Sequence, residues 1–261
     1  MLTGTSDDGV GRLVRRFLRA EGVSTDLMHL KPGRNTNAFL LSIQPPDTFE
    51  AAVYQMNSAD LWLSVADVAA APIAEAGALL FTGMGVLRPT NYAATLFAAE
   101  AAHAENIPVY MDIDYKGHQW DEDPREFGVF VRGLLRLVDV AVGTEDEICA
   151  AAGHDDLNAA VDVLLNLVRS AVVVKHGERG ATAYIVDGRT FAAPVFPVEV
   201  LNVFGAGDAF AAGLIAARHR GAGWDMALRQ AAASGALIVT RHGCANDMPT
   251  SDEVTAFLAS Q

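Results

Sequence analysis

The chain has 261 residues, of which 51% are hydrophobic and 20% are charged, and this composition is typical of a globular protein rather than of a disordered or disulfide-stabilised chain. Its 32 acidic residues against 19 basic ones give a net charge of −13, which argues against nucleic acid or an anionic membrane as a bulk partner but is compatible with a local phosphate site. Two distant cysteines, the lack of a basic and apolar leader, and a longest apolar run (209–217) of about half a membrane span together predict a cytoplasmic protein.

The first part of the chain combines a helix with a hairpin. Residues 11–21 place leucine, valine and phenylalanine on one face and four arginines on the other, so they predict an amphipathic helix that a glycine ends. Residues 38–43 and 49–54 are prone to form strands, and the proline-rich segment 44–48 between them predicts the turn of a β-hairpin. We therefore expect a small β-rich appendage at 33–57.

From residue 78 onward, strands alternate with helices. The segment 171–175 is the most β-branched strand candidate of the chain, and Pro124 is a favoured first residue of a helix. Such an alternation is typical of a parallel sheet covered by helices. The predicted strands are 78–82, 109–113, 138–142 and 171–175, and the predicted helices are 91–105, 124–137, 145–152 and 157–169.

The last third begins with a second hairpin and continues with helices. Asp187 and Gly188 are typical residues of a hairpin turn, and Thr250 with Glu253 fits a capping box at the start of the final helix. The sequence contains no repeat and no linker, so we predict a single α/β domain over residues 1–261. The predicted elements of this part are the strands 181–186 and 190–193 and the helices 207–220, 224–240 and 251–260.

The sequence Gly205-Ala206-Gly207-Asp208 runs directly into an apolar helix. Two glycines around a small residue let the backbone turn tightly with its N–H groups exposed, and a helix N-terminus adds partial positive charge. Such a turn is a cradle for an anion, and Asp208 can take a proton from a substrate hydroxyl, as phosphoryl transfer to an alcohol requires. The same residues also fit a glycine turn that starts a purely structural helix, so the motif alone leaves both interpretations open.

Other nucleotide and metal motifs are absent from the sequence. A dinucleotide fingerprint needs a third glycine where this chain has Phe210. A Walker A loop needs a lysine after a glycine, and none of Lys31, Lys116 and Lys175 follows one. The histidines form no HExxH pattern and neither cysteine has a nearby partner, so a metal cluster is not predicted.

Acidic residues follow two of the predicted strands. Asp112 and Asp114 end one strand and the acidic run 145–147 comes directly after another, where ligands usually bind in open α/β sheets. Acidic residues also stabilise a helix N-terminus, which explains the run 145–147 equally well. The glycine-containing turn 175–180 either holds a nucleotide or opens an ordinary hairpin.

The motifs of the second half of the chain follow one another in a characteristic order. They are a strand, the motif Lys175-x-Gly-x-x-Gly180, a hairpin, the block Gly205-Ala-Gly-Asp208 and a long helix. This order resembles the ribokinase-like (PfkB) family of sugar kinases, and the resemblance extends over essentially the whole chain. Further blocks are similar to a branch of that family that acts on a sugar acid, and they lie at 45–49, 54–60, 112–115, 200–205 and 241–249.

This resemblance implies a three-layer α/β/α fold with a mainly parallel central sheet, in which 33–57 is part of a small β lid. It also implies ATP-dependent transfer of the γ-phosphoryl group to the terminal hydroxyl of a sugar acid, with ATP and Mg²⁺ as cofactors and K⁺ as an optional one. The lid would cover the sugar, exclude water from the site and, as in many relatives, pair two subunits into a homodimer.

The resemblance further implies a role for each matching residue. Asp208 would be the general base, and the backbone amides of Gly205, Ala206 and Gly207 would form the anion hole. Glu147 would organise Mg²⁺ and phosphate through water. The nucleotide would contact Lys175, Gly177, Gly180, Gly243 and Asn246, and the substrate would contact Asn57, Asp114 and Lys116.

Three positions depart from the family pattern. Asn202 and Val203 stand where Asp-Thr is usual, which removes a charge from the metal region. Thr144 replaces the asparagine of an Asn-x-x-Glu motif that ends at Glu147. Lys116 replaces an arginine, which predicts a weaker phosphate clamp because lysine lacks the planar fork that binds two oxygens at once.

The largest departure concerns the start of the chain. Residues 1–11 resemble a segment that family members reach only after a central strand, part of the lid and a Gly-Gly-x-x-x-Asn sugar-binding motif. We therefore expect this chain to lack the opening strand region. Three interpretations stay open: an active sugar-acid kinase represented by a fragment or a misplaced start, a truncated nucleotide-binding module without sugar turnover, and a gene remnant that folds poorly because sheet edges stay unpaired.

Overall fold

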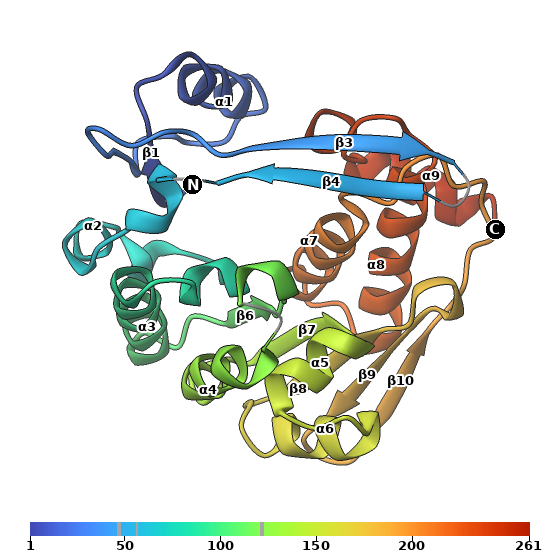
Figure 1. The fold of residues 1–261 in the computed structure, drawn as a ribbon. Coiled ribbons are helices and arrows are strands. Elements are labelled where there is room, and N and C mark those ends of the chain that lie inside the picture. The colour runs from blue at the N-terminus through green and yellow to red at the C-terminus, as the bar shows by residue number, and fades with distance from the viewer. Residues whose placement is uncertain (46–47, 56, 121–122) are drawn as a thin grey trace.

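A computed structural model describes residues 1–45, 48–55, 57–120 and 123–261 of the chain (Figure 1). Six strands form one sheet in the order β10-β9-β8-β7-β6-β5. The pairs from β5 to β8 are parallel, whereas β9 and β10 each run antiparallel to the neighbouring strand. The strands are β5 (Leu79–Thr82), β6 (Val109–Asp112), β7 (Val140–Thr144), β8 (Ala171–Lys175), β9 (Ala181–Ile185) and β10 (Thr190–Ala193).

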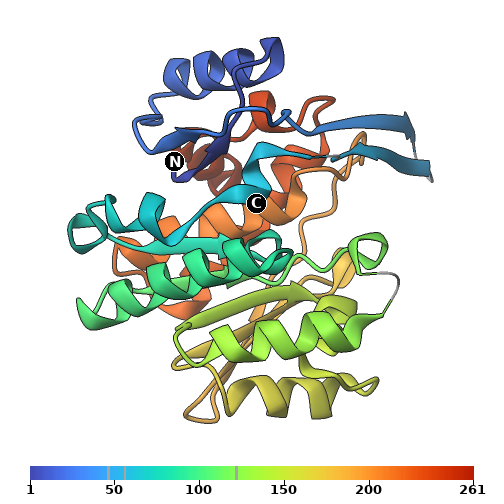
Figure 2. The same ribbon diagram turned by 60° about the vertical axis from the view of Figure 1, so that its left-hand side comes forward.

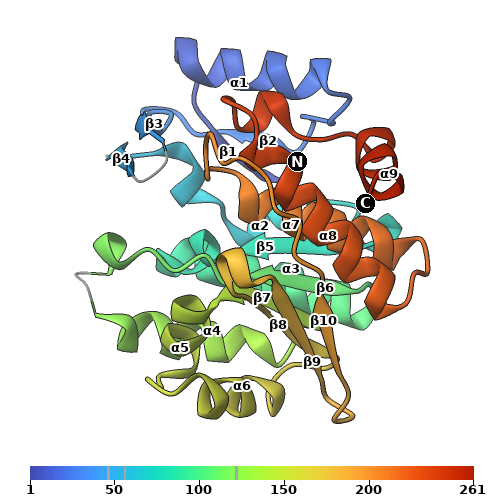
Figure 3. The same cartoon turned by 90° about the vertical axis from the view of Figure 1, so that its right-hand side faces the viewer.

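Helices cover both faces of this sheet, so the predicted three-layer α/β/α arrangement is confirmed (Figure 3). Along β8, Val172 and Val174 pack on one face and Ala171 and Val173 on the other, because successive strand residues point to opposite sides. One layer contains α3 (Pro89–Ala104), α4 (Pro124–Leu135), α5 (Glu145–Ala152) and α6 (Leu157–Leu165), and the other contains α7 (Ala206–His219) and α8 (Trp224–Val239), on which α9 (Ser251–Ala259) packs.

Most predicted elements are confirmed, and their ends shift where a tertiary contact intervenes. The segments 145–152, 171–175 and 190–193 form as predicted. The helix predicted over 157–169 ends at Leu165, because the N–H of Arg169 already donates to the carbonyl of Val138, two residues before β7. In the described part of the chain, no helix combines the length and apolarity that a membrane crossing needs.

The N-terminal segments lie beside the main body. The predicted hairpin is confirmed as β3 (Ala38–Gln44) and β4 (Thr48–Tyr54), which project beyond the helices (Figure 2). Pro46 and Asp47 of its predicted turn lie outside the described residues. The sequence pattern did not predict three short elements, because so few residues show no periodicity. They are the parallel strands β1 (Thr3–Thr5) and β2 (Met28–Leu30) and the helix α2 (Val65–Ala69). The predicted amphipathic helix is confirmed as α1 (Gly9–Ala20).

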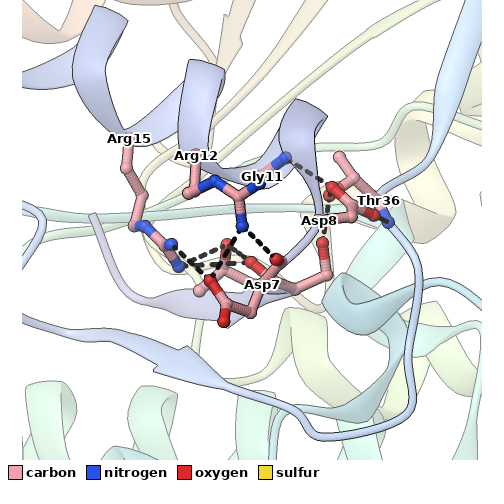
Figure 4. A network of polar contacts seen from close by, with 8 residues as sticks. Asp7, Asp8, Gly11, Arg12, Arg15 and Thr36 are labelled. Atoms are coloured by element: carbon pink, nitrogen blue, oxygen red, sulfur yellow. Dashed lines mark hydrogen bonds and ion pairs between the residues drawn. The ribbon is translucent and has the colours of Figure 1, made fainter.

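Asp8 joins the start of α1 to the base of the hairpin (Figure 4). Its carboxylate accepts the N–H of Gly11 at 2.7 Å, which caps the helix. The same carboxylate accepts the N–H of Thr36 at 2.8 Å and its hydroxyl at 2.9 Å. These hydrogen bonds lower the pKa of Asp8, the bonds to the two backbone N–H groups most of all. One side chain therefore orients both α1 and the segment that leads into β3.

We expect Asp8→Ala to lower the free energy of unfolding by about 2 kcal/mol, because the change removes a helix cap and leaves the N–H of Thr36 without its acceptor. Urea unfolding followed by circular dichroism measures this. Asp7→Ala is the matched control, since the neighbouring Asp7 side chain is 69% exposed and forms only surface ion pairs with arginines. Equal losses in both variants would contradict a structural role specific to Asp8.

Candidate active site

Charged side chains from the ends of β6 and β8, and from the segments that follow β6 and β7, meet at the carboxyl edge of the parallel sheet. Nζ of Lys175, at the end of β8, lies 3.3 Å from Oδ1 of Asp112 and 3.8 Å from Oε2 of Glu147. Nζ of Lys116 lies 2.8 Å from Oδ1 of Asp114 and 3.9 Å from Oε1 of Glu147. The parallel strands β6, β7 and β8 end side by side, so residues distant in the sequence form one cluster.

Glu147 is held in this cluster by the cap of α5. One oxygen of its carboxylate accepts the N–H of Thr144 at 2.7 Å, and the hydroxyl of Thr144 accepts the N–H of Glu147 at 3.3 Å. This reciprocal pair is a capping box. Thr144, which departs from the family's asparagine, therefore orients Glu147 between Lys116 and Lys175.

The first turn of α7 faces the same cluster. Gly205 has a φ of 87° and precedes the helix, a backbone conformation that favours glycine. A Cβ on Gly207 would lie 3.1 Å from Nζ of Lys175 and 3.9 Å from Oδ2 of Asp112. The N–H of Ala206 already contacts the carbonyl of Val203 at 3.3 Å, which leaves the amide of Gly207 as the better placed donor of the predicted cradle.

Asp208 lies in this first turn and is accessible to solvent. The surrounding protein raises the pKa of its carboxyl group above the ordinary value, and the negative charge of Asp114 raises it further. The positive charges of Lys175 and Lys116 lower that pKa in part. A carboxylate that is accessible and has a raised pKa is suited to accept a proton from a hydroxyl.

Asp112 is buried beneath the cluster. Burial raises the pKa of its carboxyl group to about 6, against the attraction of Lys175, and the charges of Glu147 and Asp114 raise it too. Lys116 has a raised pKa as well, because the attraction of Asp114 outweighs the effect of burial. The cluster thus contains more negative than positive groups.

The raised pKa of Asp112 predicts how the stability of the fold depends on pH. Between pH 4 and 6 the folded chain holds a proton on Asp112 that the unfolded chain, with its ordinary value of 3.8, has already released, so the fold loses stability as the pH rises. Relative to Asp112→Asn, the wild type should lose about 2 kcal/mol of unfolding free energy between pH 4 and 7. Urea unfolding at several pH values measures this. Asp187→Asn, at an exposed hairpin turn, is the control, and a constant difference for Asp112→Asn would contradict the assignment.

The predicted nucleotide segments border the start of α7 and the end of β8. In the turn after Lys175, Gly177 and Gly180 have φ values of 64° and 90°. Nδ1 of His176 lies 2.5 Å and Nη2 of Arg179 2.6 Å from Oε1 of Glu145. His176 is therefore a polar group of the loop, and these contacts attach the turn to α5.

The segment 241–248 lies against the glycine turn. A Cβ on Gly205 would come within 2.8 Å of Sγ of Cys244. Asn202, which is fully buried, donates from Nδ2 to the carbonyl of His242 at 3.0 Å and accepts the N–H of Phe204 at 3.0 Å. The aspartate usual at position 202 could accept but not donate here, so the asparagine directly ties the two loops together.

The predicted segment Gly243–Asn246 is ordered by Asp247. Its carboxylate accepts the N–H of Gly243 at 2.7 Å and the side-chain amide of Asn246 at 3.5 Å. Gly243 and Asn246 are thereby held close to the start of α7.

The structure brings together most of the predicted site residues but not all of them. Asp114, Lys116, Glu147, Lys175 and the first turn of α7 form one group. Asn57 instead lies at the base of the hairpin, where Nδ2 donates to the carbonyl of Gly33 at 2.9 Å. The stabilising contacts of Glu145 and Asn202 were not predicted, because they join segments that are distant in the sequence.

Comparison with known proteins identifies the class of protein. Residues 1–251 match the family described as pfkB family carbohydrate kinase. The chain is 30% identical over 259 residues to 5-dehydro-2-deoxygluconokinase of Bacillus thuringiensis (strain Al Hakam), and the match covers 97% of this chain and 78% of that relative. A relative of the same name from Geobacillus thermodenitrificans (strain NG80-2) is also 30% identical over 259 residues, with 97% and 76% covered.

Solved structures share the fold. The apo form of a putative Ribokinase II from E. coli superposes with a TM-score of 0.90 at 24% identity and covers 100% of this chain and 83% of its own. A fructokinase with bound ATP from Xylella fastidiosa has a TM-score of 0.87 at 22% identity, with 100% and 84% covered. The chain belongs to the pfkB family of carbohydrate kinases. It is therefore a phosphotransferase with a ribokinase-like fold, as the sequence motifs indicated.

Proposed function

We propose that this kinase transfers the γ-phosphoryl group of ATP to the terminal hydroxyl of a sugar acid, 5-dehydro-2-deoxy-D-gluconate, and releases ADP and the 6-phosphate. The observation that carries the proposal is the position of Asp208, an accessible carboxylate at the N-terminus of α7, beside the cluster of Lys175 and Lys116. The names of the relatives at 30% identity support the choice of substrate.

The geometry supports an in-line displacement. The acceptor oxygen forms a bond to the γ-phosphorus while the bond from phosphorus to the β–γ bridging oxygen breaks, and the hydroxyl proton passes to the carboxylate of Asp208. The amide of Gly207, the N-terminus of α7 and the ammonium group of Lys175 stabilise the negative charge on the transferred group. Lys116 and Asp114, which pair at 2.8 Å, would line the substrate side.

Carboxylates of the cluster fit a magnesium ion that arrives with ATP. Mg²⁺ prefers oxygen ligands, keeps several waters and is commonly bound through one or two carboxylates and the phosphates of the nucleotide. Among the residues that the structure describes, no group of three or more His, Cys, Asp or Glu could hold a metal ion directly. Glu147 would therefore hold Mg²⁺ through water, with Asp112 and Asp114 nearby. When bound, the ion neutralises phosphate charge.

The remaining predicted contacts concern the nucleotide and a monovalent cation. The turn that contains Gly177 and Gly180 would border the nucleotide on one side of Lys175, and Gly243 and Asn246 would border it on the other. A K⁺ ion near 243–246 stays a prediction, which assays in K⁺ and in a bulky organic cation would test.

A coupled ADP-release assay tests the proposed function. The panel should contain 5-dehydro-2-deoxy-D-gluconate, other sugar acids and neutral sugars, each with and without Mg²⁺. We expect turnover with the sugar acid above the ATPase background. Calorimetric titration with ATP should accompany this assay. ATP binding without turnover of any acceptor would favour a nucleotide-binding module instead of a kinase.

We also propose that the hairpin pairs two copies of the chain. Phe39 and Leu40 of β3 are 49% and 61% exposed, and Tyr54 of β4 is 61% exposed. An isolated two-stranded sheet is marginally stable, and a second copy would cover these apolar side chains. This observation also agrees with the lid predicted at 33–57.

We expect light scattering on a sizing column to give twice the monomer mass for the wild type and the monomer mass for Leu40→Glu. The control is Val129→Glu, which places the same charge at a 62% exposed valine of α4. A monomeric wild type would contradict the pairing.

A further inference from the structure

Two arginines share the ring of one tryptophan. The guanidinium carbon of Arg34 lies 3.5 Å and that of Arg88 5.0 Å from the centre of the Trp62 ring, distances at which a cation is attracted to an aromatic face. Neither guanidinium forms an ion pair within the described ranges. The chain has a net charge of −13, yet no carboxylate among the described residues forms an ion pair with this local positive site.

This site lies at the same edge of the sheet as the catalytic cluster. Arg88 precedes α3, which follows β5, so the start of that helix lies beyond the carboxyl end of the strand. The segment that contains Trp62 is fastened there by Asn91, which donates to the carbonyl of Asp60 at 2.9 Å and accepts the N–H of Leu63 at 3.1 Å. β5 pairs with β6, whose end carries the aspartates of the cluster.

Hydrogen bonds connect the site to the predicted substrate residues. Arg34 donates to the side-chain oxygen of Asn57, the residue whose substrate role the sequence motif implied. Two residues before Asn57, Gln55 accepts from the amide of Gln119 at 2.9 Å, and Gln119 lies three residues after Lys116. The base of the hairpin is thus fastened to the loop that carries the lysine of the substrate side.

Donors outnumber acceptors at this site. Each guanidinium carries five N–H donors and no acceptor. Nε1 of Trp62 is a buried donor without a partner among the described residues, and such donors are rare in folded proteins. A ligand that fits here is negatively charged and rich in acceptor oxygens.

We propose that Arg34, Arg88 and Trp62 recognise the carboxylate of the sugar acid, at the end of the substrate opposite to the hydroxyl that is phosphorylated. The inference rests on the proposed function, because only an acidic acceptor supplies this group. The planar fork of arginine matches a carboxylate better than a single ammonium does. The transferred phosphoryl group has its own cationic partners at Lys175 and α7, so the two negative ends of the substrate occupy separate positive sites.

Steady-state kinetics of single substitutions test the assignment. We expect Arg34→Gln and Arg88→Gln each to raise the KM for the sugar acid about 10- to 100-fold, the usual effect of a lost hydrogen bond to a charged group. The KM for ATP and that for a neutral sugar acceptor should change less than about twofold. Arg16→Gln, an exposed arginine of α1 that forms no ion pair within the described ranges, is the matched control. Equal losses with acidic and neutral acceptors would overturn the inference.

A binding measurement separates this inference from the proposed function. Trp62 is one of three tryptophans, so the fluorescence of the full chain is titrated with D-gluconate, D-glucose and inorganic phosphate, and Trp62→Phe assigns the signal. We expect a saturable change with gluconate, none with glucose, and loss of the change in Arg34→Gln. An equal response to phosphate at equal concentration would overturn the carboxylate assignment. If no acceptor is phosphorylated while gluconate still binds at Trp62, the proposed reaction fails and the carboxylate site stands.

Discussion

We expect Asp208→Asn to lower kcat about 10²- to 10⁴-fold and to leave ATP affinity nearly unchanged, because the amide cannot take the proton of the acceptor hydroxyl. The substitution keeps the size of the side chain, and Asp208 is accessible at the start of α7, so the fold should tolerate it. Comparison of kcat with the dissociation constant of ATP from calorimetry measures both effects. Asp225→Asn is the matched control, because Asp225 also lies in the first turn of a helix, α8.

The pH profile provides a second measurement of the same residue. The raised pKa of Asp208 predicts that kcat/KM of the wild type falls as the medium becomes more acidic, and that the fall begins at a higher pH than an ordinary aspartate would give. Asp208→Asn should lose this acidic limb, because the amide does not titrate. Near-normal turnover in Asp208→Asn, or an unchanged acidic limb, would exclude the role of base.

We expect Gly207→Val to lower turnover by at least about 10²-fold, the usual cost of losing a preorganised anion site. A Cβ at this position would already lie 3.1 Å from Nζ of Lys175, and the two methyl groups of valine would extend into the space that the phosphoryl group needs. The ammonium group of Lys175 could then no longer lie close to both the backbone amide of residue 207 and the carboxylate of Asp112. Single-turnover kinetics at saturating ATP measure the loss at the chemical step.

Gly207→Ala separates catalysis from stability at this position. Alanine is about 1 kcal/mol more favourable than glycine in a helix, and the tight contact of its single methyl group is with Nζ of Lys175, the end of a long side chain, while Oδ2 of Asp112 lies at an ordinary 3.9 Å. We therefore expect Gly207→Ala to melt no lower than the wild type while its turnover is reduced. Gly9→Ala, where a Cβ has no neighbour within 4 Å, controls for the gain in helix propensity. Full activity of Gly207→Val would exclude the anion-site assignment.

Local sequence signals predicted the elements that carry the site. The β-branched run of β8 and the capping residues of α5 act through near neighbours in the chain, so their bounds followed from the sequence. The motif that ends at Asp208 likewise specified its own turn, because glycine is needed where φ is 87°. Its sequence therefore predicted both a base and an anion cradle.

Contacts across the fold decided what surrounds these residues. The departure at Asn202 suggested a lost charge, whereas in the structure its amide joins two loops by donating to the carbonyl of His242. The sequence predicted a substrate role for Asn57. Only the structure showed that Asn57 contacts Arg34, that Arg34 lies over the ring of Trp62, and that this segment is bonded to α3. Such contacts between segments that are distant in the sequence leave no periodic pattern by which they could be predicted.

The amino-acid sequence alone determined the alternation of strands and helices, the glycine turn before α7 and the kinase family, since each depends on residue types at short and regular spacings. Only the tertiary structure decided that Lys175 stands between Asp112 and Glu147 and that the first turn of α7 faces this group. The reason is physical: the strengths and pKa values of charged groups depend on distances of a few ångströms and on burial, and both arise when parallel strands align their carboxyl ends.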